Sequence, residues 1–237
     1  MPNHRLIIIT GAARSGVSMT GGLFALCGAH GGRLVKASDY DGRETFENEE
    51  VRNTVVRPFL NGINADPKGM KPLPDIDIVH KLAQLVAGTW RRRVLRIIGV
   101  HRRKDYTYFY ASPLACLIWP VWCAAFPEAE WVLVRRERDE IIRSCMATGH
   151  MDRYKTEAGW GEWLDVNEQR MAELKQFASE TTRTVYPGTF VNGCLGNLQA
   201  LMQEKGLRWS PEAIEDFIVP ITWKRGVFSV SSEKIGA

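Results

Sequence analysis

The stretch Leu6–Gly22, "LIIITGAARSGVSMTGG", decides the fold prediction. Its apolar start predicts a buried strand, a glycine-bounded turn follows, and a helix is expected after the turn. This outline is typical of a phosphate-binding loop, G-x-x-x-x-G-K-[ST]. Gly11, Gly16 and Ser18 fit that pattern, but Val17 stands where the lysine is expected.

The composition is that of an ordinary globular protein. The chain has 237 residues, of which 45% are hydrophobic and 24% charged, so a sizeable core is expected and we predict one domain over residues 1–237. The formal net charge of +4 is mild. It suits an anionic ligand and gives no reason to expect a nucleic-acid partner.

Apolar runs alternate with helical patterns along the chain. Strands are predicted at Arg5–Thr10, Arg33–Ser38, Val94–Val100 and Glu130–Arg136, with a weaker fifth at Thr182–Pro187. Helices are predicted at Val17–Cys27, Asn48–Leu60, Asp77–Gly88, Pro113–Phe126, Arg138–Thr148 and Glu157–Phe177, and two more after residue 196. The alternation predicts an α/β fold, a parallel sheet with helices on both faces in the three-layer manner of P-loop NTPases. In such sheets ligands bind beyond the carboxyl ends of the strands.

Two features indicate a cytoplasmic protein without a membrane partner. The five cysteines are scattered without C-x-x-C spacing, which favours reduced thiols and argues against a metal site or disulfides. The uncharged run Leu114–Phe126 is shorter than a membrane span and contains Pro120, so we interpret it as a buried helix.

The turn from Gly11 to Ser18 has the chemistry of an anion site. Backbone N–H groups at a helix N-terminus attract a phosphate, and the side chains of Ser15 and Ser18 add donors. A kinase or triphosphatase needs a lysine here and an Asp for Mg²⁺ after a strand, and neither is apparent. Sulfuryl transfer needs less charge neutralisation, and Arg14 is placed to supply the cation on a leaving phosphate.

"GAARSGVSMT" resembles the 5′-phosphosulfate loop of sulfotransferases, often G-x-x-[RK]-S-G-[TS]-[TS]. Five residues match it, and Val17 replaces a common threonine but keeps its backbone N–H. The resemblance implies that the loop binds 3′-phosphoadenosine 5′-phosphosulfate (PAPS). The binding residues would be Gly11, Ala13, Arg14, Ser15, Gly16, Val17 and Ser18.

A second motif of that family is an Arg followed eight residues later by a Ser, both on the 3′-phosphate. Arg136 and Ser144 have this separation and resemble it. The segment "DFIVPITWKRG" weakly resembles a terminal segment that closes over the nucleotide, which implicates Lys224 and Arg225. The resemblance is specific at the two motifs and weak between Glu157 and Ser210.

The resemblance leaves the catalytic base open between two residues. Phe46-Glu47-Asn48 is similar to a "G-[YF]-[FY]-E-[ND]" segment after the second strand, where several branches keep a catalytic Glu. "GVHRRK" is similar to a "G-[VLI]-K-[DT]-P" segment after the third strand, with His101 in place of Lys. Glu47 is also compatible with a helix-supporting role, and His101 with orienting a phosphate.

These patterns predict a metal-independent sulfotransferase that acts on a small-molecule or glycan acceptor and releases adenosine 3′,5′-bisphosphate. Two other functions remain open on the residues alone: a P-loop-like protein that binds a nucleotide without catalysis, and a small-molecule kinase with an unusual loop.

Overall fold

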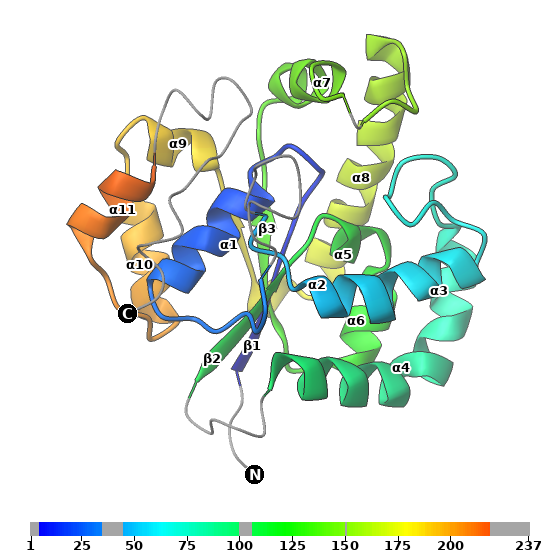
Figure 1. The fold of residues 1–237 in the computed structure, drawn as a ribbon, viewed down its shortest axis with the longest axis horizontal. Helices are drawn as coiled ribbons and strands as arrows, with labels where there is room; N and C mark the ends of the chain where they lie inside the picture. The colour runs from blue at the N-terminus through cyan, green and yellow to red at the C-terminus, as the bar shows by residue number, and fades with distance from the viewer. Residues whose placement is uncertain (1–4, 35–44, 100–105, 150, 219–237) are drawn as a thin grey trace.

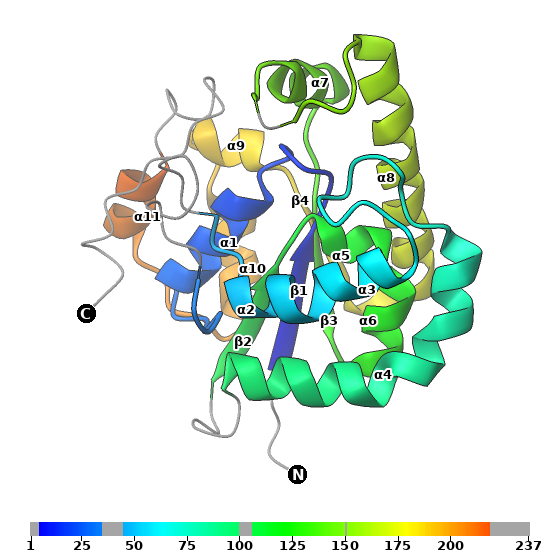
Figure 2. The ribbon, with the colours of Figure 1, turned by 45° about the vertical axis from the view of Figure 1, so that its right-hand side comes forward.

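The structure is a computed structural model that describes residues 5–34, 45–99, 106–149 and 151–218. Its four described strands are β1 (Arg5–Thr10), β2 (Thr107–Ala111), β3 (Glu130–Val134) and β4 (Thr182–Val185). They form one sheet in the order β2-β1-β3-β4, and every neighbouring pair is parallel. β1 therefore lies in the interior of the sheet, with its carboxyl end between those of β2 and β3 (Figure 2).

Helices cover both faces of this sheet (Figure 1). Ile7 and Ile9 of β1 belong to one apolar cluster with residues of α1 (Val17–Leu26), α10 (Gly196–Glu204) and α11 (Pro211–Phe217). Leu6 and Ile8 point the other way, into a cluster with α4 (Ile76–Ile98), α6 (Trp119–Ala125) and α8 (Glu157–Phe177). This alternation follows from the two-residue period of a strand, and it confirms the predicted α/β fold with helices on both faces.

The remaining helical segments have nine residues or fewer. They are α2 (Glu49–Val51), a π-helical turn η2 (Arg52–Val56), α3 (Arg57–Gly62), α5 (Leu114–Leu117), α7 (Arg138–Met146), the 3₁₀ turn η4 (Ser179–Thr181) and α9 (Pro187–Val191). The predicted helix at Pro113–Phe126 is interrupted at Ile118 and is buried, as expected.

One predicted strand is wrong, and one strand was missed. Residues 94–98 of the expected strand Val94–Val100 are the last turns of α4, whose buried positions Trp90, Val94 and Ile98 continue a helical spacing. The strand that pairs with β1 instead is β2, "TYFYA", where aromatic side chains replace the aliphatic run on which the prediction relied. Most of the expected strand Arg33–Ser38 lies outside the described residues.

Candidate active site

The loop after β1 is held against the end of β3. A Cβ added at Gly11 would lie 2.3 Å from the carbonyl oxygen of Val134, so only glycine fits where these backbones meet. The backbone N–H of Ser15 donates to the carbonyl of Ala12 at 3.1 Å, which closes a tight turn. Gly16, with φ of 106°, is the N-cap residue of α1, which begins at Val17.

Two side chains of the loop show how it differs from a lysine-bearing phosphate loop. Val17 is buried in the apolar cluster beneath α1, so the position of the missing lysine points into the core. Arg14 has φ of 71°, a left-handed conformation that costs a non-glycine residue of order 1 kcal/mol or more and that is concentrated at functional sites.

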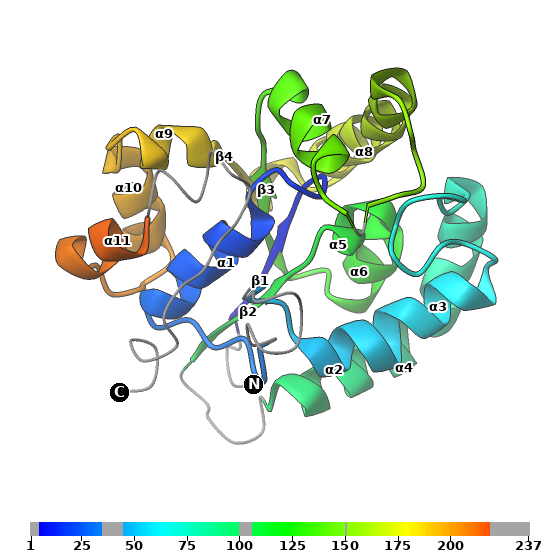
Figure 3. The same cartoon turned by 45° about the horizontal axis from the view of Figure 1, so that its top comes forward.

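The loop contacts the second predicted anchor directly. Arg14 Nε donates to Ser144 Oγ at 2.9 Å, and Arg136 Nη1 donates to the backbone carbonyl of Arg14 at 3.1 Å. Arg136 Nε also donates to Glu140 at 2.7 Å, which fixes the guanidinium against the first turn of α7. Figure 3 shows the loop lying beside α7. Two motifs about 130 residues apart in sequence thus form one hydrogen-bonded unit.

This unit fits an anionic group. Ser15 Oγ is buried and has no hydrogen-bond partner among the residues that the structure describes, and a buried hydroxyl without a partner is costly. The first N–H groups of α1 lack partners within the helix. Cys145 is buried beside the unit: burial raises the pKa of its thiol to about 12, while Arg14 and Arg136 act in the opposite direction. The positive charges of Arg14 and Arg136 therefore lie next to Cys145 and Ser144, and Glu140 pairs with Arg136 at 2.7 Å.

Glu47 lies at the same edge of the sheet. Its neighbours fix its backbone: Phe46 has φ of 47°, and Asn48 caps the following helix by accepting from the N–H of Val51 at 2.9 Å. The Phe46 ring packs on α1, where a Cβ added at Gly22 would lie 2.9 Å from Phe46 Cε2. Gly21 and Gly22 therefore leave room for Phe46 against α1, and this contact brings Glu47 close to α1.

The Glu47 carboxylate is almost fully buried among polar partners. Its Oε1 accepts from the Tyr110 hydroxyl at 3.1 Å, and its Oε2 pairs with Arg52 at 3.4 Å. Burial raises the pKa of Glu47 above its ordinary value of 4.5, opposed by Arg52, Ser112 and Tyr110. A carboxylate whose pKa is raised is a stronger proton acceptor than an ordinary surface carboxylate, and Glu47 lies beside the carboxyl end of β2.

Sequence reasoning missed Tyr110, Ser112 and Arg52. The available signal was the run "TYFYASP", because an aromatic β-rich segment followed by Ser112-Pro113 marks a strand end. The N–H of Ser112 donates to Ile9 of β1, and the Thr10 hydroxyl donates to the carbonyl of Ser112. This turn is therefore tied directly to the start of the loop.

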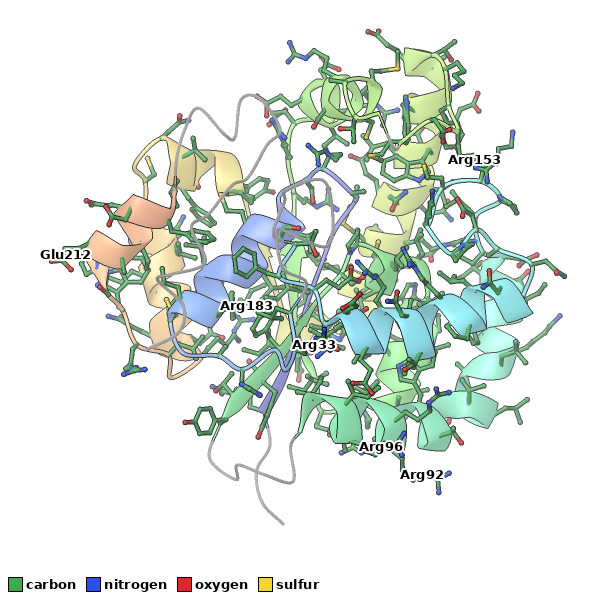
Figure 4. All side chains as sticks on the ribbon, viewed as in Figure 1. Arg33, Arg92, Arg96, Arg153, Arg183 and Glu212 are labelled. Carbon is green, nitrogen blue, oxygen red and sulfur yellow. The ribbon has the colours of Figure 1, made fainter. Side chains whose placement is uncertain are left out.

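His101, Lys224 and Arg225 lie outside the described residues. His101 was placed at a strand end because residues 94–100 were expected to be a strand, and that reason is lost because α4 continues to Ile98. Ala13 and Ser18 are partly exposed in the loop. The arginines of the run before residue 94 belong to α4; Arg92, and Arg96 one turn later, extend from it away from the loop (Figure 4).

Two features are absent from the described residues. No group of three or more His, Cys, Asp or Glu side chains in them is arranged to hold a metal ion. No helix in the same residues combines the length and apolarity that crossing a bilayer requires.

No protein-family model and no curated protein sequence matches the chain. Solved structures do. The sulfotransferase domain of the olefin synthase of Synechococcus PCC 7002 aligns with a TM-score of 0.54 and 11% identity, over 99% of this chain and 80% of that one. The fold is sulfotransferase-like. The sulfotransferase STF1 of Mycobacterium tuberculosis H37Rv aligns with a TM-score of 0.49 and 17% identity, over 99% of this chain and 74% of that one.

Proposed function

We propose that the protein transfers a sulfuryl group from PAPS to a hydroxyl or amine of a small-molecule or glycan acceptor. The observation that carries this proposal is the hydrogen bond from Arg14 Nε to Ser144 Oγ at 2.9 Å, with Arg136 bonded to the backbone of Arg14. It joins a loop suited to a 5′-phosphosulfate to a pair suited to a 3′-phosphate. The sulfotransferase-like fold supports the same conclusion.

PAPS would supply an activated sulfuryl group and a phosphate leaving group. In the protein, Ser15 and the N–H groups of the loop would bind the 5′ end, while Arg136 and Ser144 would bind the 3′-phosphate. Arg14 would stabilise the charge that grows on the leaving phosphate. Its guanidinium is planar, always charged and able to bond phosphate oxygens in a fork geometry.

Glu47 would accept the proton of the acceptor's hydroxyl or amine. It is the base candidate that the structure describes, burial raises its pKa above 4.5, and its partner Tyr110 lies on β2, which pairs with the strand that leads into the loop. Positioning, charge stabilisation and proton removal would together account for the chemistry.

A binding panel tests the proposal against the two alternative functions. Adenosine 3′,5′-bisphosphate, AMP and ATP are compared by calorimetry, each with and without Mg²⁺. We expect the bisphosphate to bind most tightly and to be indifferent to Mg²⁺; at 100 times its Kd it would stabilise the fold by about 2.7 kcal/mol. Tighter binding of Mg²⁺·ATP would instead favour the kinase function. Preference for the bisphosphate with no transfer to any alcohol or amine tested would favour a non-catalytic binding protein.

A further inference from the structure

The two oxygens of the Glu47 carboxylate have chemically different partners. Oε1 accepts from a neutral hydroxyl, that of Tyr110, at 3.1 Å, whereas Oε2 faces the cationic Nη1 of Arg52 at 3.4 Å. All three residues are less than a tenth exposed. Solvent therefore contributes little to orienting this carboxylate, and the protein groups around it, Tyr110, Arg52 and Ser112, decide how it lies.

Rigid surroundings hold both partners. Tyr110 lies on β2 in register with Ile8 of β1, and its ring stacks on Trp122 with centroids 4.9 Å apart. Arg52 begins the π-helical turn that interrupts the helix between α2 and α3. Such turns are rare and occur frequently at functional sites. Neither partner is a flexible surface side chain that happens to meet the carboxylate.

The charged and polar groups around Glu47 come from η2, α3, β2 and the turn after β2. Arg52 and Arg57 contribute positive charge from the helix after it, and Tyr110 and Ser112 contribute hydrogen bonds from β2 and the turn that follows. Glu49 also lies 4.0 Å from Arg52 and shares its charge. Arg52 is the largest of the influences that favour the ionised carboxylate, and burial opposes them all.

We propose that Tyr110 and Arg52 are positioning residues that make Glu47 a one-sided proton acceptor, with the proton taken on Oε1. A guanidinium only donates hydrogen bonds, so Arg52 disfavours a proton on the oxygen that it faces. A phenol both donates and accepts, so Tyr110 donates to the carboxylate and, after a rotation of its hydroxyl, accepts from the carboxylic acid. Its ring does not need to move.

As a step in catalysis, this inference rests on the proposed function. The proton leaves the acceptor's hydroxyl or amine for Oε1, and the electron pair of the broken bond stays on the acceptor atom. That atom bonds to sulfur while the bond from sulfur to the bridging oxygen breaks, and adenosine 3′,5′-bisphosphate leaves with the electron pair of that second bond on its 5′-phosphate. Glu47 returns the proton to water after the product leaves. Tyr110 and Arg52 act only through Glu47 and do not touch the acceptor.

A carboxyl titration followed by infrared spectroscopy tests the inference without any substrate. The protein is labelled with ¹³C-glutamate, and the band of protonated Glu47 is assigned by its loss in Glu47→Gln. Tyr110→Phe should raise the midpoint of this band by about one pH unit, the shift expected when a hydrogen bond to a charged group is removed. Arg52→Met should raise the midpoint by about one to three units, the range for losing a close opposite charge.

Tyr108→Phe is the matched control. It removes a hydroxyl from the same strand and the same face, two residues earlier, where the residue is as buried as Tyr110, and it should leave the midpoint unchanged. Equal shifts in Tyr108→Phe and Tyr110→Phe, or no shift in Tyr110→Phe, would overturn the proposal. If Arg52→Met does not fold, Tyr110→Phe and its control still decide the question.

The pH dependence of kcat/KM separates this inference from the proposed function. In Tyr110→Phe the acidic limb of the profile should move upward by the same amount as the infrared midpoint, while the KM for PAPS stays unchanged. If every variant lacks transferase activity but the infrared midpoints shift as expected, the proposed function fails and the positioning of Glu47 stands. If transfer occurs and neither readout responds to Tyr110→Phe, Tyr110 is only a packing residue.

Discussion

Arg14 at the 5′ end and Ser144 at the 3′-phosphate should be energetically coupled in binding adenosine 3′,5′-bisphosphate, and a double-mutant cycle measures whether they are. The variants are Arg14→Ala, Ser144→Ala and the combination of the two. Arg14 Nε donates to Ser144 Oγ at 2.9 Å. Each of the two side chains would also bond a charged phosphate of the ligand, and a hydrogen bond to a charged group is worth about 1.5–3 kcal/mol. Each single change should therefore lower the affinity for adenosine 3′,5′-bisphosphate by about 10- to 150-fold.

The coupling follows from the shared contact. Arg14→Ala removes the donor that orients the Ser144 hydroxyl, and Ser144→Ala removes the acceptor that orients the Arg14 guanidinium. Each change therefore also weakens the contact that the remaining residue makes with the ligand. The combined variant should lose about 1–2 kcal/mol less than the sum of the two single losses, within the range found for residues in direct contact.

Calorimetry at one ionic strength measures the four bisphosphate affinities, with AMP as the ligand that lacks the 3′-phosphate. The affinity of Ser144→Ala for AMP should fall by less than tenfold. Arg138→Ala is the control for lost charge, because Arg138 lies on the same helix and pairs with Asp165 at 2.6 Å instead of contacting the loop. Strictly additive losses, or equal losses of AMP and bisphosphate in Ser144→Ala, would refute the reasoning.

Three further predictions concern single positions. Arg14→Ala should lower kcat by about 10²-fold, the scale for losing one preorganised charge-stabilising donor, and Arg14→Lys should recover part of that loss. Single-turnover assays measure the rate of transfer. An unchanged rate in Arg14→Ala would contradict the leaving-group role. Val17→Lys should lower Tm, because the side chain is buried and a buried ammonium is poorly solvated. It should not create Mg²⁺-dependent ATPase activity, because Ser112 and Arg135, not Asp, follow β2 and β3. Phosphate-release assays check this, and strong hydrolysis would contradict the interpretation of the site. The pKa of Glu47 is raised in the folded state, so its contribution to stability is present at low pH and is lost as pH rises through that pKa. Between pH 4 and 8, the Tm of Glu47→Gln should therefore rise relative to the Tm of the unchanged protein as pH increases. A difference in Tm that does not depend on pH would argue against a raised pKa.

The sequence predicted the parts of the fold where local pattern and tertiary structure agree. β1 and β3 are short aliphatic runs between turn residues, and α8 has the predicted bounds of Glu157–Phe177. The error at residues 94–98 has a physical cause: an aliphatic run at the end of a helix has the same composition as a buried strand. Trp90, four residues before Val94, shows that the helical spacing had not ended.

The candidate site was predictable only in part, for a related reason. The loop and the pair Arg136 and Ser144 each carry a local spacing, so the sequence could place them. Tyr110 and Arg52 have no such spacing, because their connection to Glu47 is made by the pairing of β2 with β1 and by a π-helical turn. Residues that act through tertiary contacts of this kind become visible only in the folded chain.

The distance along the chain between Arg14 and Ser144 has a consequence for biosynthesis. Ser144 follows Arg14 by 130 residues, so at 5–20 residues per second the ribosome adds it about 6–26 s after the loop. β1 is made first but lies inside the sheet, and both of its neighbours, β2 and β3, are synthesised before Ser144 is. A nascent chain that ends before α7 therefore carries the loop without its partner. We expect such a chain to gain no help from the nucleotide while it folds, so its early strands must remain protected from aggregation by their own packing or by chaperones.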